Sequence, residues 1–153
     1  MPTDSGDKKP IVPFNHHVRV ESLEAPLGKG KTRIPDVVEL TNHFGTVHGS
    51  ALFTVGEVAA GSAITRLLAS DLADLRAITQ SASIKYLKTP RGAIEAEATV
   101  ELDRTTILNA ISSGNPISVP IQVRLKDVHG VLVATMSVSW FVALRKAANV
   151  KVT

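Results

Sequence analysis

The sequence predicts an α+β domain in which a curved antiparallel sheet wraps around one long central helix. Residues 49–70 are almost entirely apolar and small, with only two charges, as in a helix enclosed by other elements. Alternating apolar and polar residues on both sides of this stretch indicate strands with one solvent-facing side. The predicted order is β-β-α-β-β-(short α)-β-β, which suggests a sheet packed on a single helix.

Before the helix, the sequence indicates a flexible arm and then two extended runs. Residues 1–13 are polar and contain prolines, so we expect an arm that precedes a single domain over residues 14–153. Val18, Val20 and Leu23 alternate with polar residues as in a half-buried strand. The other stretches are expected to be a turn over residues 26–33 (PLGKGKTR), an extended run over residues 33–42 and a loop over residues 43–48.

After the helix, the clearest alternation lies between residues 92 and 102. Apolar residues there alternate with Glu95, Glu97 and Glu101, so one face of the predicted strand is solvated. Residues 88–92 (KTPRG) are expected to form a short hairpin that joins this strand to the one before it. The later elements are a short helix within residues 103–118, capped by Asp103 or Thr105 and ended by Gly114, strands over residues 119–128 and 131–144, and a tight turn at His129 and Gly130.

The strand over residues 78–88 shows the same period of two. One face of it is predicted to carry Ile78, Gln80, Ala82, Ile84 and Tyr86. The opposite face is predicted to carry Thr79, Ser81, Ser83 and Lys85.

Composition excludes several classes of function. A chain of 153 residues without cysteine has one core and no disulfide, thiolate metal site or cysteine nucleophile. The net charge of +3 comes from interspersed residues, and 4% aromatics is low for a nucleic-acid-binding protein, so no nucleic-acid partner is expected. The N-terminus lacks the apolar core of a signal peptide, which favours the cytoplasm and no membrane partner. His16 and His17 have no carboxylate at ligand spacing, so no metal is expected.

Glu57 is the unusual residue of the predicted helix. Burying an ionised carboxylate is costly unless it is paired or its pKa rises, so Glu57 is solvated, part of an ion pair, or held for chemistry. Helical geometry places Ser50, Thr54, Glu57, Gly61 and Thr65 along one side, which we call the polar stripe. Leu52, Val55, Ala59 and Ala63 lie opposite. An exposed helix face usually carries more Lys and Glu, so the stripe is predicted to face a site or an interface, with plain solvation as the alternative.

The segment from Asn42 to Ser50, NHFGTVHGS, carries a family resemblance. Together with Glu57, nine residues after His48, it resembles the signature of hotdog-fold acyl-CoA thioesterases of the phenylacetate-pathway type. In that family an Asn precedes a G-x-x-H-G-G turn, and an acidic residue follows the His by nine positions. Ser50 stands in place of the second glycine. Residues 86–92 (YLKTPRG) resemble the strand end at which that family meets coenzyme A.

The resemblance implies a hydrolase that cleaves acyl-CoA thioesters. It assigns Glu57 as a general base or as a nucleophile, and the sequence does not separate these roles. Asn42 would position the water or the acyl group, and the Gly49 N–H would stabilise the oxyanion. His48 is expected to shape the turn rather than to act in catalysis. Thr79 falls where some family members place a hydroxyl against the nucleophilic water.

Four further residues are assigned to the substrate. Lys88 and Arg91 would contact the phosphates of coenzyme A, or else lie at a solvated hairpin tip. Ser50 and Thr54 of the polar stripe are expected to line the substrate site. No cofactor is expected, since coenzyme A enters as part of the substrate. The apolar strand around Trp140 is expected to place that residue in the core.

Helix geometry separates two of the predicted catalytic groups. Gly49 and Glu57 lie about 12 Å apart along the helix axis, too far to act on one thioester within a single chain. A working site therefore needs the Gly49 end of one helix beside the Glu57 of another. The resemblance implies the same, because hotdog subunits pair side by side, and a homodimer or a dimer of dimers is expected.

Two alternatives remain open. A non-catalytic hotdog domain that binds or senses acyl-CoA would keep the groove without needing a base. His43 lies fourteen residues before Glu57, the spacing of the histidine and the acid in hotdog hydroxyacyl dehydratases.

Overall fold

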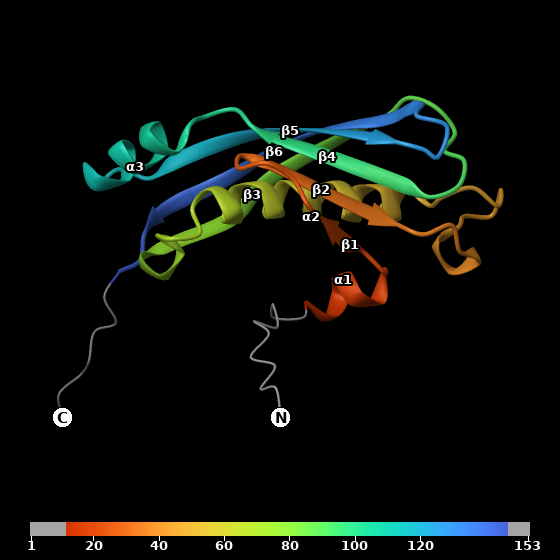
Figure 1. Cartoon of the computed structure of the whole chain (residues 1–153), viewed down its shortest axis with the longest axis horizontal. Coiled ribbons are helices and arrows are strands. Elements are labelled where there is room, and N and C mark those ends of the chain that lie inside the picture. The colour runs from red at the N-terminus through yellow and green to blue at the C-terminus, as the bar shows by residue number, and fades with distance from the viewer. Residues whose placement is uncertain (1–11, 147–153) are drawn as a thin grey trace, which may run out of the picture.

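A computed structural model of the chain describes residues 12–146 and shows one six-stranded antiparallel sheet around a central helix. The helix α2 (Gly49–Leu67) runs along one face of the sheet, and α1 (Pro13–His17) lies on the far side of α2 (Figure 1). The sheet order is β1-β2-β4-β5-β6-β3. The strands are β1 (Glu21–Leu23), β2 (Lys29–Ile34), β3 (Leu75–Tyr86), β4 (Ile94–Val100), β5 (Ile117–Lys126) and β6 (Leu132–Leu144). The predicted fold class and order of main elements are confirmed.

The core lies between α2 and the concave face of the sheet. Small residues on the buried side of α2 let the strands approach its backbone closely. The buried residues of α2 are Ala51, Leu52, Val55, Gly56, Ala59, Ala60, Ala63 and Ile64. The helix ends at Leu67, three residues before the predicted end, with Leu68 as its C-cap. Within residues 12–146, no helix has both the length and the hydropathy that a bilayer crossing requires.

The turn predicted over residues 26–33 is wrong, because most of that stretch is strand β2. Gly30, Thr32 and Ile34 are buried and face α2, while Lys29 and Arg33 are exposed. Only Ile34 is apolar among the three inward residues, which hid the alternation. Gly30 serves close packing here: a Cβ built on it would overlap the carbonyl oxygen of Ala59 on α2.

The extended runs predicted before the helix are only partly correct. Pro13 begins α1, since its fixed φ suits the first turn of a helix, and only residues 21–23 form a strand. Residues 33–34 belong to β2, and the rest of the second run is a loop that contains the short 3-10 helix η1 (Val38–Leu40). The arm predicted over residues 1–13 falls almost wholly outside the described residues.

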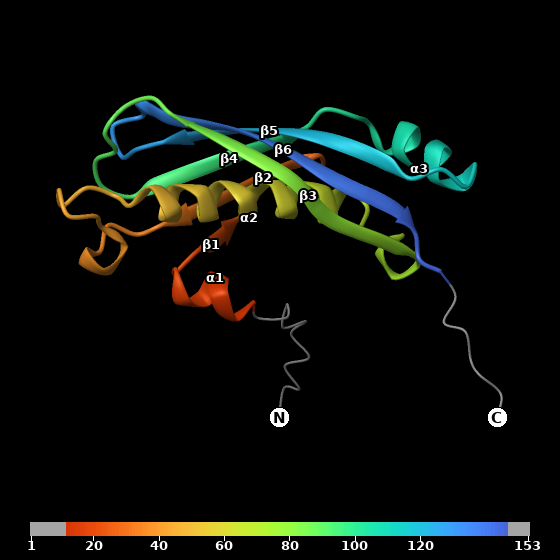
Figure 2. The ribbon, with the colours of Figure 1, turned by 180° about the vertical axis from the view of Figure 1, so that it is seen from behind.

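The predicted hairpin at residues 88–92 is also wrong. β3 pairs with β6 at the edge of the sheet, and β4 pairs with β2 and β5, so the two strands are not neighbours (Figure 2). The connection instead crosses the end of the β5–β6 hairpin. There Asp127 Oδ1 accepts hydrogen bonds from the N–H groups of His129 and Val131, and its Oδ2 accepts one from the Arg91 N–H. Burial raises the pKa of Asp127, but these hydrogen bonds outweigh it and hold the pKa below its ordinary value.

A β-bulge interrupts the alternation of β3. The register with β6 shifts between Thr79 and Ser81, so Gln80 is an extra residue in β3. The residues that face α2 are therefore odd-numbered before the bulge and even-numbered after it. Before the bulge, Thr79 faces α2, and after it Tyr86 does so as well. The sequence prediction placed Thr79 and Tyr86 on opposite faces, which is wrong because strict alternation cannot represent the inserted residue.

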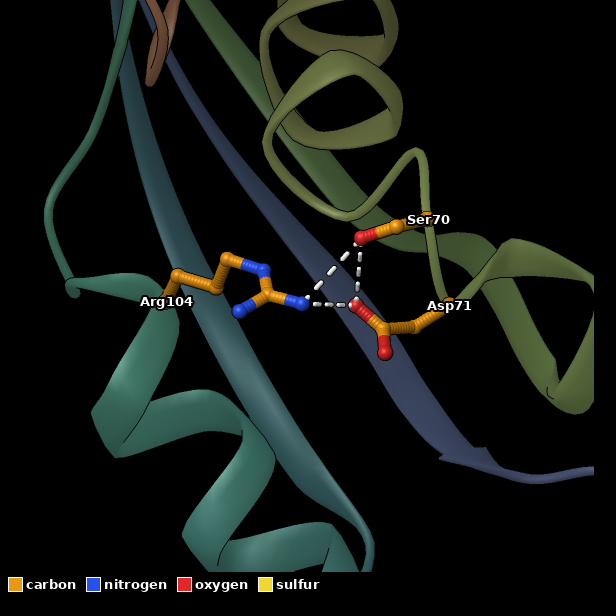
Figure 3. A network of polar contacts seen from close by, with 3 residues as sticks. All are labelled: Ser70, Asp71 and Arg104. Atoms are coloured by element: carbon orange, nitrogen blue, oxygen red, sulfur yellow. Dashed lines mark hydrogen bonds and ion pairs between the residues drawn. The ribbon is translucent and has the colours of Figure 1, made fainter.

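The predicted short helix is confirmed as α3 (Arg104–Ser112). Asp103 caps it by accepting a hydrogen bond from the Thr106 N–H at 2.7 Å, and Gly114 follows it with a positive φ of 83°. Figure 3 shows how Arg104 contacts Ser70 and Asp71 in the segment that follows α2. A 3-10 helix, η2 (Leu72–Asp74), then leads from that segment into β3. The contacts of Arg104 tie α3 to the end of α2.

Candidate active site

Glu57 lies half-buried on α2 with its carboxylate held by a hydroxyl group. The Thr79 hydroxyl donates a hydrogen bond to Glu57 Oε1 at 2.9 Å. Among the described residues, Glu57 forms no ion pair. Arg66, the other charge of the helix, donates to the backbone carbonyls of Ala25 and Lys29 instead. The carboxylate is therefore positioned without being neutralised by a cation of the described chain.

Glu57 faces a cavity of about 400 Å³, which we call the Glu57 cavity. Its walls come from α2, from the segment around α1, from β1 and from β6. The lining residues are Val12, Asn15, Ser22, Glu57, Val58, Gly61, Ser62, Thr65, Arg66 and Trp140. Its volume lies in the range of small-molecule sites, and six of its ten lining residues are polar or charged.

The polar stripe predicted on the helix is observed. All four apolar residues opposite it are buried, whereas its own members are half-buried or exposed. Two of its hydroxyls are used within the helix: Thr54 donates to the Ser50 carbonyl and Thr65 to the Gly61 carbonyl. Glu57 is thus the one ionisable group of the stripe and faces the cavity.

The N-terminus of α2 forms a second candidate region. His48 is the N-cap residue, and its Nδ1 accepts a hydrogen bond from the Ser50 N–H at 3.0 Å. In the described part of the chain, the Gly49 N–H donates to no group. The Tyr86 hydroxyl donates to the Gly49 carbonyl at 3.2 Å. Because the Gly49 N–H has no acceptor there, it is free to donate to a bound anion or carbonyl.

A separate cavity of about 640 Å³ opens at this end of the helix, and we call it the Gly49 cavity. The loop before α2 and the segment after β3 line it. Among the predicted site residues it contains Asn42, His48, Gly49, Ser50 and Lys88. The Glu57 cavity shares no lining residue with it. The structure thus places Gly49 and Glu57 at different openings of one chain, as the helix geometry predicts.

Asn42 is engaged in its own loop. Its Oδ1 accepts hydrogen bonds from the Phe44 and Thr46 N–H groups at 3.0 and 3.2 Å, and its Nδ2 donates to Thr46 Oγ1 at 3.0 Å. These contacts shape the turn that leads to His48. The role predicted for Asn42 toward water or the acyl group stays a prediction.

Of Lys88, Arg91 and His43, only Lys88 lines one of the two cavities. Lys88 lies in the Gly49 cavity, where a cation could meet a phosphate. Arg91 is exposed and lines neither the Gly49 nor the Glu57 cavity. His43 stacks on Phe44 in the exposed loop, with ring centroids 3.9 Å apart, and no described contact joins it to Glu57.

Sequence reasoning missed two residues of these sites. Tyr86 was assigned to a strand face and to a motif but to no site, yet its hydroxyl contacts the helix N-terminus. Trp140 is in the core as predicted, but it also lines the Glu57 cavity. The signal for Trp140 was Gly61, a glycine inside a helix, since a Cβ built there would lie 3.2 Å from the indole.

Replacing His48 with alanine is expected to lower the free energy of unfolding by about 1 kcal/mol, because the Ser50 N–H loses its cap. His48→Asn should keep most of the stability, since asparagine is a good N-cap. Urea denaturation followed by circular dichroism measures both variants. Equal losses for alanine and asparagine would mean that the hydrogen bond does not stabilise the helix.

The sheet order and the single enclosed helix define the hotdog fold, the class expected from the sequence. The chain belongs to the family described as Domain of unknown function (DUF4442), whose model matches residues 10–142. No curated protein matches the sequence.

Solved structures share the fold at low sequence identity. A Pseudomonas aeruginosa protein of unknown function, named a probable thioesterase, superposes with a TM-score of 0.77 at 20% identity, over 88% of this chain and 89% of that one. The PaaI protein from the phenylacetic acid degradation operon of E. coli has a TM-score of 0.67 at 13% identity, over 89% and 86% of the two chains. A mutant of the phenylacetic acid degradation protein PaaI from Thermus thermophilus gives 0.66 at 19% identity, over 85% and 98%. The resemblance stated from the sequence is confirmed at the level of the fold.

Proposed function

We propose that this protein is an acyl-CoA thioesterase that hydrolyses small or medium acyl-CoA thioesters at a site formed between two subunits. The observation that carries the proposal is the Glu57 carboxylate, held by the Thr79 hydroxyl at 2.9 Å and facing a cavity of about 400 Å³. Similar folds named as thioesterases support the same class of reaction. A domain that only binds acyl-CoA would not need a positioned, unneutralised carboxylate.

Glu57 can serve the reaction in either of two ways. As a general base it takes a proton from water while the water oxygen attacks the thioester carbonyl carbon. As a nucleophile it attacks that carbon itself, and water then hydrolyses the mixed anhydride. Either route puts negative charge on the carbonyl oxygen, where the Gly49 N–H at the positive end of α2 would stabilise it. Collapse of the intermediate breaks the C–S bond, and the released thiolate of coenzyme A takes up a proton.

The site needs two subunits because one chain separates its parts. Gly49 and Glu57 are about 12 Å apart along α2 and lie in different cavities. A partner placed beside the first subunit, with its α2 antiparallel, would bring the Gly49 end of one helix to the Glu57 of the other. Lys88 in the Gly49 cavity would then lie near the phosphates of coenzyme A.

Release of free thiol from a panel of acyl-CoAs tests the proposal. Because the chain has no cysteine, a thiol-reactive chromogenic reagent reacts only with the released coenzyme A. We expect turnover of at least one straight-chain or aromatic acyl-CoA from short to medium length. Tight binding of the acyl-CoAs without thiol release would overturn the proposed thioesterase activity and identify a binding domain. Hydration of an enoyl-CoA, lost in His43→Ala, would instead identify a dehydratase.

A further inference from the structure

A third cavity, of about 850 Å³, lies at the end of the sheet where β3 begins and β6 ends, and we call it the Arg76 cavity. The loop after α3 lies at the same end (Figure 2) and forms another wall. The Gly49 cavity is at the other end of β3. The Arg76 cavity shares no lining residue with the Gly49 cavity or with the Glu57 cavity. The steps of the proposed reaction leave it without a role.

The charge of this cavity is positive. Arg76, Arg145 and Lys146 line it, and among residues 12–146 no acidic side chain does. None of the three cations forms an ion pair within that part of the chain. Arg145 Nη2 donates to the Leu75 carbonyl at 3.3 Å, which orients the guanidinium and leaves it further N–H donors. Three cations without a counter-ion favour an occupant that carries several negative charges.

The floor of the Arg76 cavity is the outer face of the sheet, away from α2. Thr79 faces α2, so Arg76, an odd number of positions earlier on β3, faces outward, as does Ala143 opposite it on β6. Phe141 lies two residues before Ala143 and is half-buried on the same face. Because an aromatic ring offers a flat surface to a nucleobase, the cavity fits a ligand that combines phosphates with a base.

The Arg76 cavity lies near the proposed catalytic carboxylate. Arg76 is three residues before Thr79, which contacts Glu57, and this separation is about 10 Å of extended strand. Because β3 is at the edge of the sheet, a flexible ligand can pass round it from the α2 face to the outer face. Coenzyme A has the required shape, since a long pantetheine arm separates its thioester from a nucleotide with a diphosphate and a 3′-phosphate.

The proposed two-subunit arrangement would bring a further cation to this place. Within one chain, β3 contacts both ends of the proposed site. Its Thr79 contacts Glu57, and its Tyr86 contacts the carbonyl of Gly49. A partner whose α2 is antiparallel would therefore set the Tyr86 end of its own β3 beside Thr79. Lys88, two residues beyond Tyr86, would then lie beside the start of the first β3, which lines the Arg76 cavity.

We propose that the Arg76 cavity binds the nucleotide end of coenzyme A. Arg76, Arg145 and Lys146 contact its phosphates, Phe141 contacts its adenine ring, and the acyl group lies at Glu57 of the same chain. This inference rests on the proposed function for the identity of the substrate. Contacts so far from the thioester are equal in the ground state and the transition state, so their loss raises KM and leaves kcat unchanged.

The kinetic test removes two of these cations together, both exposed. In the double variant Arg76→Gln and Lys146→Gln, the KM for an acyl-CoA is expected to rise about tenfold with kcat unchanged, because charge-assisted contacts to phosphate are lost. The same acyl group on pantetheine, which has no phosphate, should show the wild-type KM in this variant. Arg124→Gln is the matched control, since it removes an exposed cation of the outer face outside the Arg76 cavity. An unchanged KM for the acyl-CoA would overturn the inference, and so would an equal rise with the pantetheine thioester or in Arg124→Gln.

A binding test separates this inference from the proposed function. Adenosine 3′,5′-bisphosphate carries the base and the 3′-phosphate of the nucleotide end without a thioester, and isothermal titration calorimetry measures its Kd. The double variant is expected to bind it about tenfold more weakly than the wild type, and an acyl-CoA should displace it from the wild type. That result in a protein that releases no thiol would support the nucleotide site and overturn the thioesterase. Absent binding, equal binding by both proteins, or binding that an acyl-CoA does not displace would overturn the nucleotide site even if hydrolysis is observed.

Discussion

Gly30→Ala is expected to lower the free energy of unfolding by at least about 3 kcal/mol, which corresponds to a fall in Tm of roughly 10 °C for a domain of this size. The new Cβ would overlap the carbonyl oxygen of Ala59 and lie 2.8 Å from the amide nitrogen of Ala63. Both are backbone atoms of α2, so no side-chain rotation can relieve the overlap. Moving the helix away would also weaken the buried hydrogen bond of 2.6 Å from the Thr32 hydroxyl to the Val55 carbonyl.

Gly56→Ala is the matched control, at a close contact between α2 and the strands β5 and β6. A Cβ there would overlap the sulfur of Met136, which is the flexible end of a side chain and can rotate away. Alanine also gains about 1 kcal/mol of helix propensity over glycine at this helical position. Thermal and urea denaturation should therefore show that Gly30→Ala is much less stable than Gly56→Ala. Equal losses, or a stable Gly30→Ala, would contradict the close packing of β2 on α2.

Gly30 also shows where sequence reasoning reached its limit. In sequence, glycine beside lysines and another glycine suggested a turn, because its local signal is the same for a turn and for close packing. The distinction depends on α2, which lies elsewhere in the chain. The apolar character and position of α2, by contrast, were predicted correctly because they depend only on residues within the helix. The same holds for α3 and its Asp103 cap, since capping is a local contact.

Non-local features account for the other errors. The position of β3 at the sheet edge depends on pairing with β6, whose paired residues lie 48 to 69 positions later in the chain. The segment between β3 and β4 gave a hairpin-like signal. The bulge at Gln80 changed the face of every later residue of β3, and nothing in the local composition marks it. For the site, the motif predicted the Gly49 and Glu57 regions, whereas the contact of Thr79 with Glu57 required the bulged strand to be seen against the helix.

Glu57→Gln is expected to lower kcat/KM for acyl-CoA hydrolysis by about a thousandfold, because glutamine keeps the shape of the side chain but can neither accept a proton from water nor attack the carbonyl. Thr79 can still donate to the amide oxygen, so the fold should be unchanged. Glu101→Gln removes an exposed carboxylate outside both cavities and should retain full activity. Rates of thiol release at saturating and limiting substrate concentrations measure the activity of the wild type and of both variants. Activity of Glu57→Gln above about a tenth of wild type would exclude Glu57 as base or nucleophile.

Mixed dimers extend this prediction to the subunit boundary. Gly49→Pro removes the N–H proposed to stabilise the oxyanion, and it suits the first position of a helix after the extended His48 (φ −65°, ψ 139°). Alone it should be nearly as inactive as Glu57→Gln. A dimer with one subunit of each kind, isolated by two different affinity tags, keeps one intact site from the Gly49 of one chain and the Glu57 of the other. It should recover about half of the wild-type kcat, because a symmetric dimer has two equivalent sites. If each site belonged to a single chain, both sites of the mixed dimer would be damaged and it would be as inactive as its parents.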